Sequence, residues 1–133
     1  TLRPVKWLSL RVPSLYRDEQ WDTPKRKLDR QDLARYRSAF VPASENRALR
    51  ACLQFRGDVL LVESEHDHLV PRSTIMSYRA AFQNAHSLTH RVIDDADHAL
   101  SDKTAQQAYT SILVNWVTEM VVGARVGRSH RIA

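Results

Sequence analysis

The second half of the chain alternates short apolar runs with amphipathic segments. Residues 58–63 hold four apolar residues in a row and predict a buried strand, and residues 88–93 predict a second strand. Residues 71–85 carry apolar side chains at helical spacing. Residues 103–122 follow the i, i+3, i+4, i+7 pattern along their length, which is the strongest helix prediction in the chain. Because strands and helices alternate, we predict parallel strands covered by helices.

The first half begins with one strand pattern and then changes character. Residues 5–10 predict a strand, and Pro13 ends it. Residues 17–57 are polar and predict a helical insertion, with helix starts at Thr23-Pro24 and at Ser44. The expected fold is therefore one α/β domain over residues 1–133. Its parts are a strand region (1–16), the insertion (17–57), a strand–helix–strand–helix unit (58–124) and a frayed basic tail (125–133).

The length and composition fit one globular domain with a single core. The chain has 133 residues, of which 43% are hydrophobic. It holds no apolar run of the roughly 20 residues that a membrane span needs, so we expect a soluble, cytoplasmic protein without a membrane partner. The single Cys52 has no partner for an internal disulfide, and its place on an apolar helix face predicts an inert core thiol.

The charge is distributed unevenly along the chain. The net charge is +5, but residues 1–57 carry 13 Lys and Arg against 6 Asp and Glu, whereas residues 58–124 carry 4 against 9. A basic segment of this kind is compatible with an acidic partner or with nucleic acid. It lacks interleaved aromatic residues and any nucleic-acid motif, so nucleic-acid binding is disfavoured.

Two polar clusters follow the strands predicted in the second half. SEHDHLVP comes after residues 58–63, and DDADHALSD comes after residues 88–93. In an open parallel sheet, ligands bind at the carboxyl ends of the strands. If the two strands are neighbours, Asp67 and His98 lie on adjacent loops, where the carboxylate would orient the imidazole as a general base. The alternative is an ordinary turn aspartate and a surface histidine.

Other groups in the same clusters admit different interpretations. His66 and His68 flank Asp67, and with Asp97 and His98 they would offer ligands for zinc or iron. Alternate residues of a strand point to opposite faces, however, and no further ligand spacing supports a metal. We therefore predict no metal and expect both histidines to be loop residues near the site. Asp97, beside His98, is either part of a solvated turn or an electrostatic neighbour of the base.

A family resemblance is carried by these same residues. GDVLLVESEHDHLVP, followed 31 residues after Asp67 by the histidine of DADHALSD, resembles the C-terminal part of an α/β-hydrolase. In that family the triad runs nucleophile, acid, histidine along the chain. The resemblance covers residues 58–122 and implies that Asp67 is the acid and His98 the base. It also implies that residues 17–57 form a helical cap. Trp21 and Tyr36 of this cap, and His68 in the loop beside Asp67, would contribute to substrate binding. The alternative for the two aromatic residues is packing beneath the insertion.

The chain departs from this family in one respect. It contains no G-x-S-x-G: the pair of glycines at the right separation is Gly123 and Gly127, with Arg125 between them. The resemblance therefore implies that the nucleophile, its turn and the oxyanion loop precede Thr1. The expected parent activity is hydrolysis of a carboxylic ester or related acyl bond, as in a serine esterase or peptidase, without a cofactor, whereas this chain alone is expected to be inactive.

The expected partners follow from the same resemblance. They are a small acyl substrate and the missing N-terminal half of the domain. A three-stranded remnant exposes a strand edge and an apolar face, so self-association is also expected. The alternative to a hydrolase is a non-catalytic interaction module that binds another protein or, less favoured, nucleic acid.

Overall fold

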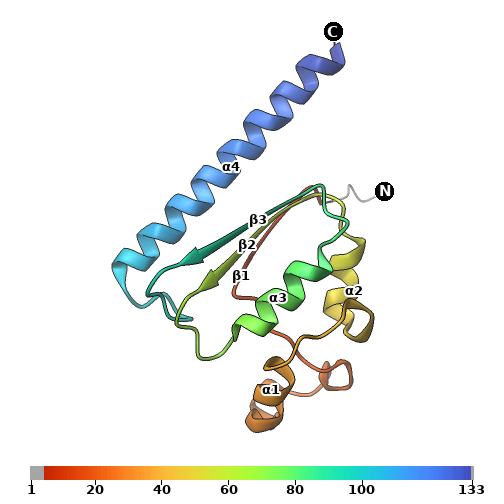
Figure 1. Ribbon diagram of the computed structural model, residues 1–133, viewed down its shortest axis with the longest axis vertical. Coiled ribbons are helices and arrows are strands. Elements are labelled where there is room, and N and C mark those ends of the chain that lie inside the picture. Colours follow the sequence, from red (N-terminus) through yellow and green to blue (C-terminus); the bar gives the residue numbers. More distant parts are fainter. Residues whose placement is uncertain (1–4, 133) are drawn as a thin grey trace.

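The fold is a three-stranded parallel sheet with helices on both faces (Figure 1). The computed structural model describes the backbone of residues 5–132 and the side chains of residues 5–126. The strands lie in the order of the sequence: β1 (Trp7–Arg11), β2 (Asp58–Ser64) and β3 (Ser87–Ile93). Both strand pairs are parallel, so the predicted α/β class with parallel strands is confirmed.

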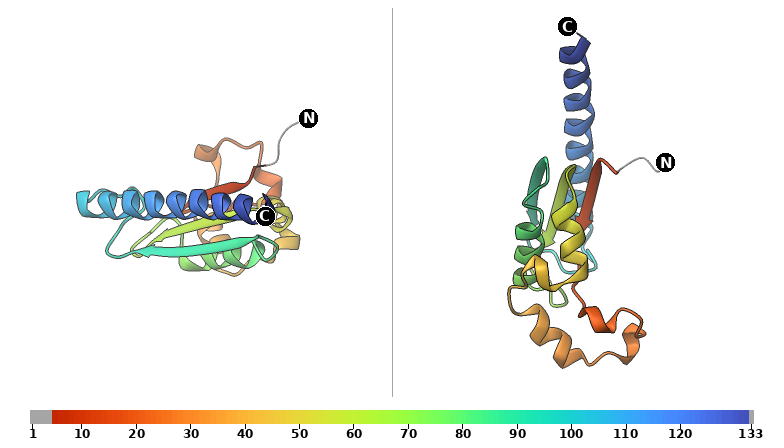
Figure 2. Two further views of the ribbon diagram at one scale, coloured as in Figure 1. Left: turned by 90° about the horizontal axis from the view of Figure 1, so that it is seen from above. Right: turned by 90° about the vertical axis from the view of Figure 1, so that its right-hand side faces the viewer.

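Four α-helices connect or flank these strands. They are α1 (Arg30–Arg37), α2 (Arg47–Gln54), α3 (Arg72–Ala81) and α4 (Lys103–Ile132). The central strand β2 separates two apolar clusters, since its alternate side chains point to opposite faces. Val59 and Leu61 pack with α2 and α3, whereas Leu60 and Val62 pack with Trp116 of α4. Figure 2 shows the resulting layers, with α4 on one face of the sheet and α2 and α3 on the other.

The two helices of the second half differ in length from their predictions. The prediction that a helix spans residues 71–85 is too long, because α3 ends at Ala81 and Phe82 leaves the helical region with ψ 27°. The prediction that the last helix ends at Val122, followed by a frayed tail, is wrong, since α4 continues through Ile132. Arginine is a good helix former, and the tail contains no proline to stop the helix.

The starts of the first two helices were also predicted at the wrong residues. The Thr23-Pro24 and Ser44 signals lie at two short 3₁₀ turns, Lys25–Lys27 and Ala43–Glu45. Helix α1 begins instead after Asp29 and α2 after Asn46. Each of these side chains accepts hydrogen bonds from two backbone N–H groups of the first helical turn. These caps satisfy donors that have no partner within the helix, and they therefore define its start.

Helix α4 extends well past the sheet at its C-terminal end (Figure 1). Its inner face carries Ala105, Tyr109 and Trp116 against the sheet, whereas Val114 and Val117 are exposed. Within residues 5–132, no helix combines the length and the apolar character needed to cross a bilayer.

Candidate active site

Asp67 lies in the loop that follows β2, and its carboxylate is held by the backbone. Its Oδ1 atom accepts hydrogen bonds from the N–H groups of Leu69 and Val70, both at 2.8 Å. The side chain is only 2% exposed. Two amide donors fix the carboxylate in one orientation, so its second oxygen, Oδ2, is directed at a single partner.

That partner is His98, in the loop between β3 and α4. Its Nδ1 atom lies 2.8 Å from Oδ2 of Asp67. The two loops meet because β2 and β3 are parallel neighbours whose carboxyl ends share one edge of the sheet. A carboxylate at Nδ1 favours the tautomer that carries its proton there, which leaves Nε2 as the basic nitrogen. The imidazole is 36% exposed. Within the described residues, Nε2 has no hydrogen-bond partner.

The backbone around His98 is held by contacts with the rest of the site. Arg11, the last residue of β1, donates a hydrogen bond to the carbonyl oxygen of His98 at 2.7 Å and also stacks over the ring of Tyr109. Asp95 and Leu100 flank the histidine with positive φ angles of 57° and 53°. Residues other than glycine adopt this conformation only where surrounding contacts impose it. The position of the imidazole is therefore set by all three strands.

The two loops are also tied to each other directly. The N–H of Glu65 donates to the carbonyl of Ile93 at 3.1 Å, and the N–H of His66 donates to the carbonyl of Ala96 at 2.8 Å. These bonds continue the pairing of β2 and β3 beyond the strands. They keep the backbone on either side of the Asp67–His98 contact in a fixed register.

A second histidine–carboxylate pair, His90 and Glu63, is not arranged for proton transfer. The Nε2 atom of His90 lies 2.7 Å from Glu63, whose side chain is 6% exposed, and its Nδ1 atom lies 3.3 Å from Arg79. Arg72 donates a further hydrogen bond to the same carboxylate oxygen at 3.0 Å. Both ring nitrogens are therefore engaged. The group is a polar network between the sheet and α3, in which Glu63 and His90 are enclosed and Arg72 is exposed.

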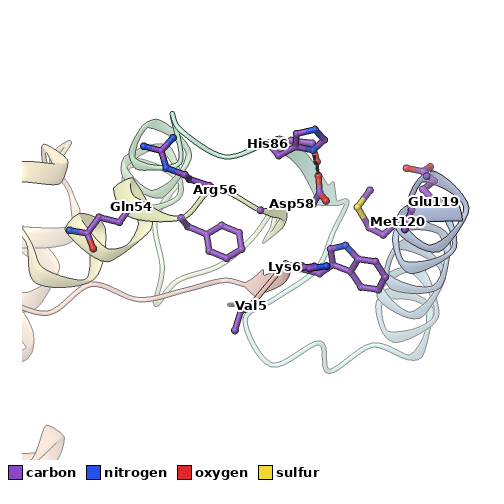
Figure 3. Close-up of a pocket in the computed structure, with 14 residues that line it drawn as sticks. Val5, Lys6, Gln54, Arg56, Asp58, His86, Glu119 and Met120 are labelled. Atoms are coloured by element: carbon purple, nitrogen blue, oxygen red, sulfur yellow. Dashed lines mark hydrogen bonds and ion pairs between the residues drawn. The ribbon is translucent and has the colours of Figure 1, made fainter. Parts of the chain in front are cut away.

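A third pair, His86 and Asp58, lies at the opposite end of the sheet. It borders a cavity of about 1240 Å³ that is lined by the amino ends of the strands and by α4 (Figure 3). His86 is 79% exposed on its side chain and lies 2.9 Å from Asp58. Desolvation acts to raise the pKa of Asp58, but the hydrogen bonds from Ser87 and His86 together outweigh it and lower the pKa. The aspartate is less enclosed than Asp67, and the pair lies away from the carboxyl ends of the strands, where ligands of parallel sheets bind.

Asp97 precedes His98 but is engaged elsewhere. Its two carboxylate oxygens accept hydrogen bonds from the hydroxyl and the backbone N–H of Ser101, at 2.6 and 2.8 Å. These bonds hold the pKa of Asp97 below its usual value. The residue therefore shapes the turn into α4, in agreement with the interpretation of this acidic run as a turn.

The predicted substrate-binding residues do not share one pocket. Trp21 borders a cavity of about 470 Å³ together with Tyr16 and Tyr78. Tyr36 borders a different cavity of about 590 Å³, and its hydroxyl accepts a hydrogen bond from Asn46. Their separation could not be predicted from local residue patterns, because the path of the insertion depends on where its helices are capped. His68 is exposed in the loop after Asp67.

The insertion is nevertheless anchored to the loop that carries Asp67. Arg37, the last residue of α1, reaches the carbonyl of Leu69 at 3.4 Å and the carbonyl of Leu15 at 3.0 Å. Its own carbonyl accepts hydrogen bonds from Ser73 and Thr74 at the start of α3. Helix α1 therefore lies beside the Asp67 loop.

The side chains that come together as possible metal ligands differ from those that the sequence suggested. His68, Asp97 and His98 do not form a group of metal ligands. Among the described residues, one group of three such side chains comes together: Glu65, His66 and Asp95. Cys52 is not a candidate ligand or nucleophile, because burial raises the pKa of its thiol to about 11.

Sequence reasoning missed three features around this site. Arg11 could have been recognised from the sequence, since it is a charged residue at the carboxyl end of a predicted strand, where site residues gather. No local sequence pattern indicates the Glu63–His90 network or the position of Asp95, because each depends on contacts between separate strands or loops.

Comparison with known proteins gives no further assignment. The chain matches no model of a known protein family, and no curated protein is significantly similar to it.

Proposed function

We propose that Asp67 and His98 are the acid and the base of an acyl-transfer triad, in a hydrolase that cleaves a carboxylic ester or a related acyl bond. The observation that carries the proposal is the 2.8 Å contact between a buried, doubly anchored carboxylate and a half-exposed imidazole. Two histidines lie against carboxylates at the carboxyl edge of the sheet within the described residues. The partners of His66, Glu65 and Asp95, are exposed, whereas the partner of His98, Asp67, is buried. The order of acid and base also agrees with the α/β-hydrolase resemblance.

The proposed reaction uses His98 twice. Nε2 takes the proton of a serine hydroxyl while the serine oxygen attacks the carbonyl carbon of the substrate. The same proton passes to the leaving group as the bond between carbonyl carbon and leaving group breaks. In the second half, Nε2 takes a proton from water while the water oxygen attacks the acyl carbon. That proton passes to the serine oxygen as the acyl–serine bond breaks and the acid leaves. Asp67 holds the imidazole and stabilises the imidazolium that forms at each step.

The proposed nucleophile lies outside residues 1–133. No serine, threonine or cysteine among the described residues forms a hydrogen bond with Nε2 of His98. The nucleophile and the donors of an oxyanion hole would be supplied by a preceding segment that packs beside β1. The fold would then include residues 17–57 as a cap over the site, and the reaction would need no cofactor.

An ester assay with matched variants tests the proposal. The 133-residue chain should not hydrolyse p-nitrophenyl esters, whereas the protein extended by its preceding coding sequence should. In the extended protein, His98→Ala should lower kcat by at least about 10³-fold. His86→Ala, which removes the exposed pair at the other end of the sheet, is the control and should leave kcat unchanged. Full activity of the His98→Ala variant would refute the assignment.

The second candidate function is an interaction module, and one specific observation favours it. Within residues 5–132, β1 has a strand neighbour on one side only, and the exposed Trp7 lies at its start. A free strand edge pairs readily with another chain. Hydrolysis by the extended protein distinguishes the cases, because a module of this kind would bind another chain and show no hydrolysis. Self-association of the 133-residue chain is expected on either proposal.

A further inference from the structure

The two loops that carry Asp67 and His98 hold a second cluster on their solvent side. Nε2 of His66 lies 3.0 Å from Oε1 of Glu65 and 3.4 Å from Oδ1 of Asp95. Each residue offers one donor atom, and all three atoms lie within 4.8 Å of one another. One nitrogen and two carboxylate oxygens therefore converge from two different loops.

We propose that Glu65, His66 and Asp95 form a binding site for a divalent transition-metal ion of the zinc type, and that the ion links the loop after β2 to the loop after β3. Imidazole nitrogen and carboxylate oxygen are ligands that zinc accepts. Three protein ligands leave a fourth position for water.

The spacing of the donor atoms supports this assignment. In a tetrahedral zinc site with bonds of about 2.1 Å, neighbouring ligand atoms lie about 3.4 Å apart. The separations of 3.0 and 3.4 Å around His66 are close to this value. The separation between the two carboxylate oxygens is at most 4.8 Å, and both side chains are exposed and able to rotate. A calcium or magnesium site would instead require more oxygen ligands.

The backbone arranges the donors before any ion arrives. The bonds from Glu65 to Ile93 and from His66 to Ala96 hold the two loops together. The left-handed backbone of Asp95 lies in the turn between β3 and His98, and its N–H lies 3.4 Å from Oε1 of Glu65. The backbone of both loops is then already ordered before an ion binds. The ion also neutralises the repulsion between the two carboxylates.

The site is distinct from the Asp67–His98 pair although it shares both loops. His66 is the neighbour of Asp67 in the chain, yet Nδ1 of His98 faces Asp67 and not this cluster. His98 contributes no atom to the cluster of Glu65, His66 and Asp95, so an ion there would stabilise the loops without using the proposed catalytic histidine as a ligand.

Calorimetric titration of the chelator-treated 133-residue chain with Zn²⁺ tests the inference. We expect saturable binding of one ion and a rise in melting temperature. His66→Ala should weaken the binding by at least about tenfold. Asp95→Gly should do the same, and it is suited to the site because glycine accepts the positive φ at this position.

Matched controls separate this site from general binding to histidine. His68→Ala and His86→Ala each remove an exposed histidine outside the cluster and should leave the zinc affinity unchanged. Equal affinity in the wild type and in His66→Ala would overturn the proposal, as would the absence of a saturable site in the wild type. Because the readout is metal binding, its result does not depend on whether the protein is a hydrolase.

Discussion

Nδ1 of His98 and Oδ2 of Asp67 lie 2.8 Å apart although 31 positions separate them in the chain. The contact exists because parallel strands deliver both loops to one edge of the sheet. Its geometry is determined on one side by two amide donors to Asp67 and on the other by the bond from Arg11 to the carbonyl of His98. A pair held from both sides keeps its orientation without a ligand.

Asp67 should matter for stability as well as for any chemistry. Asp67→Ala leaves the N–H groups of Leu69 and Val70 without their acceptor, so we expect a loss of about 1–3 kcal/mol in the free energy of unfolding. Asp67→Asn keeps an acceptor oxygen and should cost less. Urea denaturation measures both. Asp94→Ala, at an exposed carboxylate nearby, is the control and should change stability by less than about 0.5 kcal/mol. Equal stability of Asp67→Ala and wild type would contradict the anchoring role.

Ser101 should control the titration of Asp97. Its hydroxyl and backbone N–H lower the pKa of that carboxyl from the usual 3.8. A lowered folded-state pKa contributes stability that is present above pH 3.8 and is lost as the pH falls through the folded pKa. Ser101→Ala should move the pKa of Asp97 upward and reduce this acid sensitivity, as followed by NMR of the carboxyl carbon. Ser101→Thr should restore the lowered pKa. An unshifted pKa in Ser101→Ala would rule the hydroxyl out as the cause.

Substitution by alanine should have opposite effects on stability at Gly57 and Gly123. A Cβ at Gly57 would overlap the carbonyl oxygen of Lys6 and lie 2.8 Å from the ring of Phe55, whereas a Cβ at Gly123 meets nothing within 4 Å. Gly57→Ala should therefore destabilise the fold by more than about 1 kcal/mol, because β1 must move away from β2. Gly123→Ala, within α4, should stabilise it by about 0.5–1 kcal/mol. Thermal denaturation of the two variants compares them, and a neutral Gly57→Ala would argue against this close approach.

The buried network of Glu63 and His90 should behave as a unit. His90→Leu leaves the carboxylate of Glu63 with Arg72 as its remaining side-chain partner, and we expect a loss of about 1–3 kcal/mol. Glu63→Leu should cost a similar amount. The double variant Glu63→Leu/His90→Leu should cost less than the sum, since it leaves no unpaired buried charge. A double-mutant cycle from urea denaturation measures the coupling. Strict additivity would mean that the 2.7 Å contact contributes nothing to stability.

The elements with strong periodicity could be predicted from the sequence, whereas the insertion could not. The buried strand 58–63 and the helix from Lys103 were recognised because their apolar spacing matches the pattern of each structure. The helices of residues 17–57 were predicted to start in the wrong places, because threonine, serine, aspartate and asparagine all cap helices. Only the path of the chain decides which of them meets free N–H groups.

The candidate site was likewise predictable from the sequence only in part. The sequence by itself determined that acidic and histidine residues follow two strands, and parallel order then placed Asp67 and His98 on adjacent loops. Tertiary structure alone decided that Nδ1 faces the carboxylate, that Arg11 supports the loop and that His66 joins Glu65 and Asp95. These relationships depend on side-chain directions between segments far apart in the chain, and local residue patterns carry no information about them.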